Sequence, residues 1–143
     1  MRIEVHQLSK SYQQIQAVNK ISFTAQAGQI LGFLGPNGAG KSTTMKMLSC
    51  FIPPSSGTAQ ICGFDILEQP MEVRRHIGYL PEHNPLYLDL YVREALEFMA
   101  GIHQLEKPRQ RIIEVIEQVG LAQEQHKKIR ALSKGYRQRV GLA

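Results

Sequence analysis

A glycine-rich stretch between an apolar run and a helical run constrains the fold of this chain more than any other feature. The apolar run, residues 29–34, predicts a buried strand, and residues 41–50 predict a helix. The stretch between them matches the pattern G-x-x-x-x-G-K-[ST], and it consists of Gly35, Pro36, Asn37, Gly38, Ala39, Gly40, Lys41 and Ser42. A strand, a glycine-rich loop and a helix in this order predict a mixed α/β fold with one phosphate-type turn.

The residue types in this loop suit the binding of a nucleotide. Glycines let the backbone curl so that several N–H groups point at phosphate oxygens, with the N-terminus of the next helix behind them. Lys41 is expected to reach the β and γ phosphates, and the Ser42 hydroxyl is expected to hold Mg²⁺. The loop therefore predicts nucleotide binding, although taken alone it leaves kinases, GTPases and transport ATPases open.

The remaining sequence predicts further strands and then a largely helical stretch. Strands are expected around Ile3 to Leu8 and Val18 to Ala25, at residues 57–62 and, as a short piece, at residues 77–80. Helices are expected at residues 70–76, 92–102 and 108–120, with a loop at residues 81–90. The last two helices are each predicted to bury an apolar face, formed by Val92, Ala95, Leu96, Met99 and Ile102 and by Ile112, Ile113, Ile116 and Val119.

The composition excludes several classes of protein. Apolar residues make up 43% of the 143 residues and charged residues 20%, which excludes disordered and fibrous chains. No run approaches the roughly 20 apolar residues of a membrane-spanning helix, and the start of the chain enters a strand pattern directly, which predicts a soluble, cytoplasmic protein. The net charge of +5 comes from scattered residues, so no nucleic-acid partner is expected. Cys50 and Cys62 are expected to be reduced and packed as small apolar groups.

Three further segments carry a resemblance to a known family. Residues 132–139, Leu-Ser-Lys-Gly-Tyr-Arg-Gln-Arg, resemble the LSGGQ signature of ATP-binding-cassette (ABC) ATPases. Residues 77–82 lie between the phosphate loop and this signature, where the family has its glutamine loop, and Tyr12 lies where the family has an aromatic residue that stacks on adenine. The chain is identified as a member of this family over essentially its whole length. Residues 78–87 and the form of the signature are most similar to those of drug-exporter-like and gliding-motility-type exporters.

The resemblance implies a P-loop NTPase fold of the ABC type. This fold combines an N-terminal antiparallel β part, a RecA-like core that begins in this chain, and a helical subdomain. By this resemblance, residues 1–76 hold the strands and the phosphate-loop core, residues 77–91 the glutamine-loop region, residues 92–131 the helical subdomain, and residues 132–143 the signature and the start of its helix. The family's next motifs, an apolar strand ending in Asp (Walker B) and the catalytic Glu, are not among these residues. The chain is therefore expected to be the N-terminal part of one ABC ATPase domain, without hydrolytic activity of its own.

The resemblance also implies roles for individual residues. Tyr12 is expected to stack on the adenine of ATP, and the backbone N–H groups from Gly38 to Thr43 to surround its phosphates. In the family, two cassettes pack head to tail and each signature closes on the γ-phosphate that the partner holds. A homodimer or a pair with a second ABC subunit is thus implied, with a signature formed by Ser133, Lys134, Gly135 and Tyr136.

Three positions depart from the family pattern. Glu82 replaces the usual glutamine; its carboxylate can ligate Mg²⁺ as a hard oxygen donor, but it would stand close to an anionic phosphate. A solvated loop glutamate without such a role remains the alternative. Tyr136 replaces the last glutamine of the signature. Tyr91 stands where relatives often have a capping threonine, so Asp89 is expected to cap the next helix instead.

The leading hypothesis is an ATPase subunit that energises export across the cytoplasmic membrane. The resemblance implies a transmembrane permease partner and a peripheral location on the inner face of that membrane. A cassette that acts on ribosomes or DNA is a second hypothesis, and a nucleotide-binding regulatory module without hydrolysis is a third.

Overall fold

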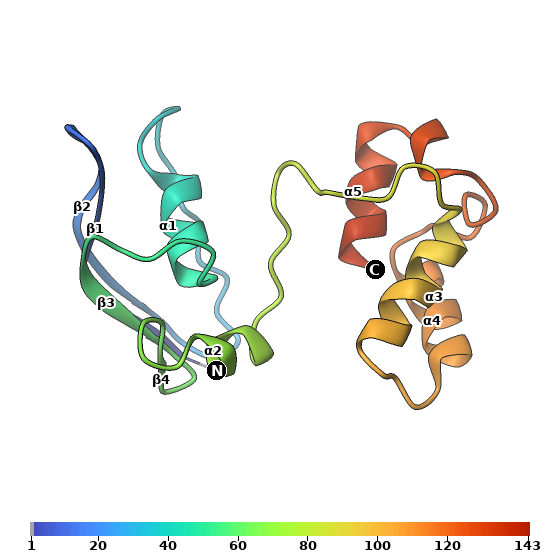
Figure 1. Ribbon diagram of the computed structural model, residues 1–143, viewed down its shortest axis with the longest axis horizontal. Coiled ribbons are helices and arrows are strands. Elements are labelled where there is room, and N and C mark those ends of the chain that lie inside the picture. The colour runs from blue at the N-terminus through green and yellow to red at the C-terminus, as the bar shows by residue number, and fades with distance from the viewer. Residues whose placement is uncertain (1) are drawn as a thin grey trace. The chain divides into compact units, whose positions relative to one another are not determined.

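The computed structural model describes residues 2–143 and divides the chain into two units (Figure 1). The first unit ends at Tyr79 and the second spans Leu80–Ala143. The first contains a sheet with two helices, and the second contains three helices with a short 3₁₀ turn. No helix within residues 2–143 combines the length and the apolar character that crossing a membrane requires.

The first unit is built on an antiparallel sheet of four strands in the order β2-β1-β3-β4. These strands are β1 (Ile3–Tyr12), β2 (Ile15–Ala25), β3 (Ser56–Ile61) and β4 (Phe64–Asp65). β1 and β2 form a hairpin whose connection consists of Gln13 and Gln14, and the Gln13 backbone adopts a left-handed conformation with φ 53°. The first three strands confirm the strands predicted from apolar periodicity.

Two helices cover one face of this sheet, as Figure 1 shows for α1 (Lys41–Leu48) and α2 (Pro70–Arg75). Met47 of α1 and Val73 of α2 are fully buried with the inward residues of the strands, because alternate strand residues share one face. The buried cluster comprises Val5, Leu8, Val18, Met47, Leu48, Ala59, Ile61, Ile66 and Val73.

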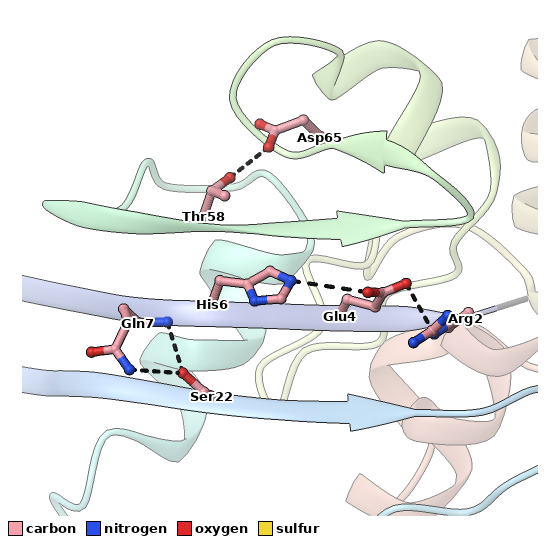
Figure 2. Close-up of polar contacts among 7 residues, drawn as sticks. All are labelled: Arg2, Glu4, His6, Gln7, Ser22, Thr58 and Asp65. Carbon is pink, nitrogen blue, oxygen red and sulfur yellow. Dashed lines mark hydrogen bonds and ion pairs between the residues drawn. The ribbon is translucent and has the colours of Figure 1, made fainter.

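The opposite face of the sheet carries polar side chains, several of which are drawn in Figure 2. Arg2 Nε lies 2.9 Å from Glu4 Oε1, and His6 Nε2 lies 3.9 Å from Glu4 Oε2. On the neighbouring strands, the Thr58 hydroxyl donates to Asp65 Oδ2 at 2.7 Å. Burial of Asp65 acts to raise its pKa, but this hydrogen bond and those from the N–H groups of Leu67 and Glu68 prevail and hold the pKa below its ordinary value.

Both cysteines are free and partly buried, as expected, and they pack against the buried cluster of the first unit. Burial raises the pKa of the Cys50 thiol, the Arg74 guanidinium opposes this effect, and the Asp65 carboxylate adds to it. Cys50 is therefore a protonated packing group, because its thiolate form is disfavoured.

The second unit buries one apolar cluster among its helices. These elements are α3 (Val92–Ile102), α4 (Pro108–Gln118), η1 (Ile129–Ala131) and α5 (Lys134–Leu142). Pro108 begins α4 and Gly120 follows its end with φ 67°, as the sequence predicts. The cluster comprises Val92, Ala95, Leu96, Ala100, Ile112, Val115, Ile116, Leu121, Ile129, Leu132 and Val140.

The prediction of a buried strand at residues 29–34 is wrong for this structure. The segment is irregular, and Ile30 and Leu34 are 99% and 95% exposed. A buried strand needs a neighbouring backbone to satisfy its N–H and C=O groups. No segment within residues 2–143 pairs with residues 30–34, although Phe33 does make an edge-to-face contact with Phe23 of β2, at 5.1 Å between ring centroids. The RecA-like parallel strand is thus not formed here.

Smaller corrections concern the second half of the chain. Residues 77–80 form no strand, for the same lack of a pairing partner. Met99, Ile102 and Ile113 are exposed, because the narrow contact between α3 and α4 takes only part of each apolar stripe. Asp89 does not cap α3; Tyr91 is the capping residue, with its backbone N–H bound to Glu94 Oε2 at 2.9 Å. Asp89 instead forms an ion pair with Arg130.

One contact attaches the glycine-rich loop to the sheet. Gly40, which precedes α1, has φ 83°, and a Cβ at this position would overlap the Ala17 carbonyl of β2 and lie 2.9 Å from Val18 Cγ2. The loop therefore meets β2 backbone to backbone, which only a glycine permits.

We predict that Gly40→Ala destabilises the protein more than Gly28→Ala does. Both glycines have positive φ, where a Cβ costs about 1–2 kcal/mol, but a Cβ on Gly28 meets nothing within 4 Å. The overlap at Gly40 adds about 1–3 kcal/mol. Urea denaturation of the two full-length variants should show the larger loss for Gly40→Ala; equal losses would contradict the close approach.

Candidate functional site

The glycine-rich loop of the first unit ends at the N-terminus of α1. Gly38 and Gly40 have φ 86° and 83°, and the Ala39 N–H donates to the Pro36 carbonyl at 3.3 Å, so the backbone curls tightly before the helix. α1 begins at Lys41, and its first turn contains no acidic residue. The local sequence permits this geometry, since each left-handed position of the turn is a glycine.

The N–H groups of this turn are available for an anion. Those of Gly38, Gly40, Lys41, Ser42 and Thr43 form no hydrogen bond with any group in the part of the chain that the structure describes. Within α1, the Thr44 N–H is the first to form a hydrogen bond, to the Gly40 carbonyl at 2.9 Å, and the Thr44 hydroxyl donates to the same oxygen at 3.0 Å. Free N–H groups and the positive end of the helix dipole together favour a phosphate at this place.

Lys41 places a fixed positive charge beside these N–H groups. Its Nζ donates to the carbonyl oxygens of Gly35 at 2.8 Å and Pro36 at 2.6 Å, so the side chain folds back across the loop. Both contacts are to neutral carbonyls. The ammonium charge is thus not compensated by these partners, and it adds to the attraction for phosphate.

Ser42 is the residue of this loop that suits a divalent cation. Its side chain is exposed in the first turn of α1 and its hydroxyl forms no hydrogen bond within residues 2–143. No group of three or more His, Cys, Asp or Glu side chains suited to a metal occurs among the described residues. A cation held here would take most of its ligands from phosphate and water, which is how Mg²⁺ is usually bound.

Tyr12 lies at the same end of the β1–β2 hairpin as the loop. Tyr12 pairs with Ile15 and Lys10 pairs with Val18, at the start of β2. Gly40 of the loop packs on Ala17, which lies between these two positions of β2. The Tyr12 ring is 46% exposed, with Lys10 Nζ 5.4 Å from its centroid. The structure therefore brings the predicted adenine-stacking aromatic and the phosphate loop to one end of the sheet, through a β2 contact that the sequence pattern did not reveal.

The predicted signature lies in the second unit, at the start of α5. Ser133 caps this helix, and its hydroxyl oxygen accepts from the Tyr136 N–H at 3.3 Å. Lys134 and Gly135 are exposed in the first turn, and the Arg139 guanidinium carbon lies 5.3 Å from the centroid of the Tyr136 ring. Tyr136, which departs from the family pattern, thus forms a local stack on its own helix.

Glu82 also lies in the second unit, in the loop before α3, and its side chain is exposed. Its backbone carbonyl accepts from Gln138 Nε2 of α5 at 2.7 Å. Gln138 lies in the segment that resembles the signature, but the sequence did not predict this contact, because the pattern carries no information on a partner 56 positions away. Ser42 and Glu82 belong to separate units, so a shared metal site remains a prediction.

Comparison with known proteins agrees with this geometry. Residues 18–143 match the family model described as ABC transporter. The chain is 38% identical to an uncharacterized ABC transporter ATP-binding protein, YxlF, of Bacillus subtilis, over 99% of this chain and 47% of that protein. It is 36% identical to a probable multidrug ABC transporter ATP-binding protein, YbhF, of Escherichia coli, over 99% of this chain and 25% of that protein.

A solved structure shares the fold. The ATP-binding subunit of an ABC transporter superposes with a TM-score of 0.84 at 28% identity, over 99% of this chain and 60% of that chain. Of the two curated relatives named above, the chain spans about half of YxlF and about a quarter of YbhF. The match to the family model covers most of its length, and the chain belongs to the ABC transporter family, with the fold of its ATP-binding domain.

Proposed function

We propose that this chain binds ATP and, within the full-length protein, takes part in ATP hydrolysis that energises transport. The observation that carries the proposal is the turn at Gly38–Thr43, where free N–H groups, a helix N-terminus and the Lys41 ammonium meet. Such a site binds a polyphosphate, and its attachment to the hairpin that carries Tyr12 suits a nucleotide with an aromatic base. The relatives named as ATP-binding proteins support the same activity.

In this proposal, each candidate site residue of the first unit has a distinct role. The N–H groups orient the phosphates, and Lys41 moves from the loop carbonyls to the β and γ phosphates, where it balances charge that grows in the transition state. Tyr12 holds the adenine. Ser42 would hold Mg²⁺, which when bound neutralises phosphate charge. Glu82, which belongs to the second unit, is the second candidate ligand.

The second unit is proposed to act on the nucleotide of a partner cassette. Ser133, Lys134 and Gly135 are exposed at the N-terminus of α5, where a phosphate group of the partner's ATP would meet a helix dipole. We propose a homodimer or a pair with a second ABC subunit, bound to a membrane-embedded permease at the inner face of the cytoplasmic membrane. The name of YbhF supports a drug-exporter-like role, and the likeness to gliding-motility-type exporters rests on the sequence alone.

The division of the chain into four functional segments is likewise a proposal. The hydrolytic base would lie in a Walker B region outside these 143 residues, so we expect the chain alone to bind ATP without hydrolysing it. No nucleic-acid partner is proposed.

Lys41→Ala should lower ATP turnover of the full-length protein by about 100-fold or more, because the phosphates lose their nearest fixed positive charge. Lys46→Ala is the matched control, since Lys46 is an exposed lysine in the last turn of the same helix. Steady-state phosphate release measures both variants. Turnover of the Lys41 variant within a factor of two of wild type would refute the proposed function.

Tyr12→Ala should weaken ATP binding by about 1–3 kcal/mol, because a stacking surface is removed while the phosphate turn remains. Tyr12→Phe keeps the ring and should change little. Calorimetric titration with ATP and with tripolyphosphate separates the two parts of the site: only ATP binding should respond. If Phe and Ala were equally harmful, the hydroxyl and not the ring would be the contact.

Glu82→Gln should lower the affinity for Mg²⁺ and leave ATP affinity at saturating Mg²⁺ nearly unchanged, if Glu82 ligates the metal. The Gln138 bond goes to the backbone of residue 82, so this substitution changes the side chain alone. Glu117→Gln, on the exposed side of α4, is the control. If the Mg²⁺ concentration for half-maximal ATPase activity were the same in this variant as in the wild type, Glu82 would be a solvated loop residue without a role in metal binding.

A further inference from the structure

We infer that Gln138 is a positioning residue that fixes the Glu82 segment to α5, the helix that Ser133 caps. The inference rests on the proposed function for its catalytic consequence, but not for its structural part. Its basis is the hydrogen bond from Gln138 Nε2 to the Glu82 carbonyl, 2.7 Å long, between residues of the same unit.

The two halves of the loop before α3 are held in different ways. The second half is tied to η1 by its backbone, since the N–H groups of Ile129 and Arg130 donate to the carbonyls of Leu90 and Leu88 at 2.9 and 3.0 Å. Arg130 also pairs with Asp89. This half therefore stays in place whatever residue stands at position 138.

The first half depends on Gln138. Within residues 81–86, the Leu86 N–H bonds locally to the Asn84 carbonyl. The Gln138 bond is the one hydrogen bond, among the residues that the structure describes, that joins residues 81–86 to another element. Removing its donor would leave residues 81–86 attached to the other elements by packing contacts alone, so the backbone that carries Glu82 would move more easily than the rest of the loop.

Packing on the same face of α5 agrees with this attachment. Gly141 lies three residues after Gln138, so the two share a helix face. A Cβ on Gly141 would overlap the Asn84 side chain and lie 2.9 Å from Leu80 Cδ1. The loop thus runs directly against the α5 backbone, and Figure 1 shows it crossing this helix.

The consequence is a mechanical link between two predicted parts of the site. Ser133 caps the N-terminus of α5, and Gln138 joins the second turn of the same helix to Glu82. A displacement of α5 therefore carries the Glu82 backbone with it. Position 82 and the signature then respond together, whichever side chain stands at position 82.

A protease that cuts after glutamate tests the attachment in the full-length protein without nucleotide. Gln138→Leu should speed cleavage after Glu82 about three- to tenfold, the factor expected for the loss of one net hydrogen bond. Gln138→Glu keeps the length and polarity of the side chain but has no N–H to donate, so it should give the same increase. Gln110→Leu is the matched control, because the side chain of Gln110 bonds to Glu114 of its own helix and, within residues 2–143, to no other element.

Two results would overturn the attachment. One is an unchanged rate of cleavage after Glu82 in both Gln138 variants. The other is faster cleavage that extends equally to Glu97 and Glu117 within α3 and α4, which would show general unfolding of the helices.

A double-mutant cycle tests the catalytic consequence. Gln138→Leu should raise the Mg²⁺ concentration for half-maximal ATPase activity about three- to tenfold, the factor of one hydrogen bond. In the Glu82→Gln background the same change should produce no further shift, whereas additive shifts would overturn the positioning role. Absence of ATPase activity in the wild type would refute the proposed function instead, and the protease result would still decide the attachment.

Discussion

The candidate site of the first unit depends on the close approach of the Gly40 backbone to the Ala17 carbonyl of β2. This contact sets the start of α1 against the sheet, and the burial of Met47 and Leu48 fixes the C-terminal end of the helix. It also places the free N–H groups at the end of the hairpin that carries Tyr12. A backbone contact of this kind leaves no room for a side chain. The position of the phosphate turn therefore depends on its packing against β2 as well as on the conformation of its glycines.

The charge of Lys41 is not balanced by a neighbouring acid. Some basic side chains elsewhere have carboxylate neighbours one turn away, as Arg75 has Glu72 and Arg111 has Glu114. Lys41 contacts carbonyl oxygens instead, and the first turn of its helix has no acid. Exposed ion pairs such as Arg75–Glu72 contribute little to the stability of the fold. A cation without a paired anion, beside free N–H groups, is an arrangement that gains most when an anionic ligand arrives.

The sequence predicted local structure well and long-range pairing less well. Glycine and proline positions and apolar periodicity predicted three of the four strands of the antiparallel sheet (β1, β2 and β3), the helices and the phosphate turn, because each depends on neighbours within a few residues. The segment from Ile30 to Leu34 failed, since an apolar run becomes a strand only when another backbone pairs with it. The roles of Ala17 and Gln138 were not predicted from the sequence, because each is defined by a contact with a residue far away in the chain.

The sequence of α5 meets both a local requirement, a helix cap, and a long-range requirement, a contact with a distant loop. Ser133 must stand directly before the helix, because its hydroxyl replaces a missing backbone acceptor for Tyr136. Gln138 and Gly141 obey a different constraint, the spacing of one helix face, and they meet a loop that lies more than 50 residues earlier in the chain. A single nine-residue helix thus satisfies a local cap at its first turn and a long-range attachment at its second. For this reason a change in the position of the cap is transmitted to the backbone of Glu82.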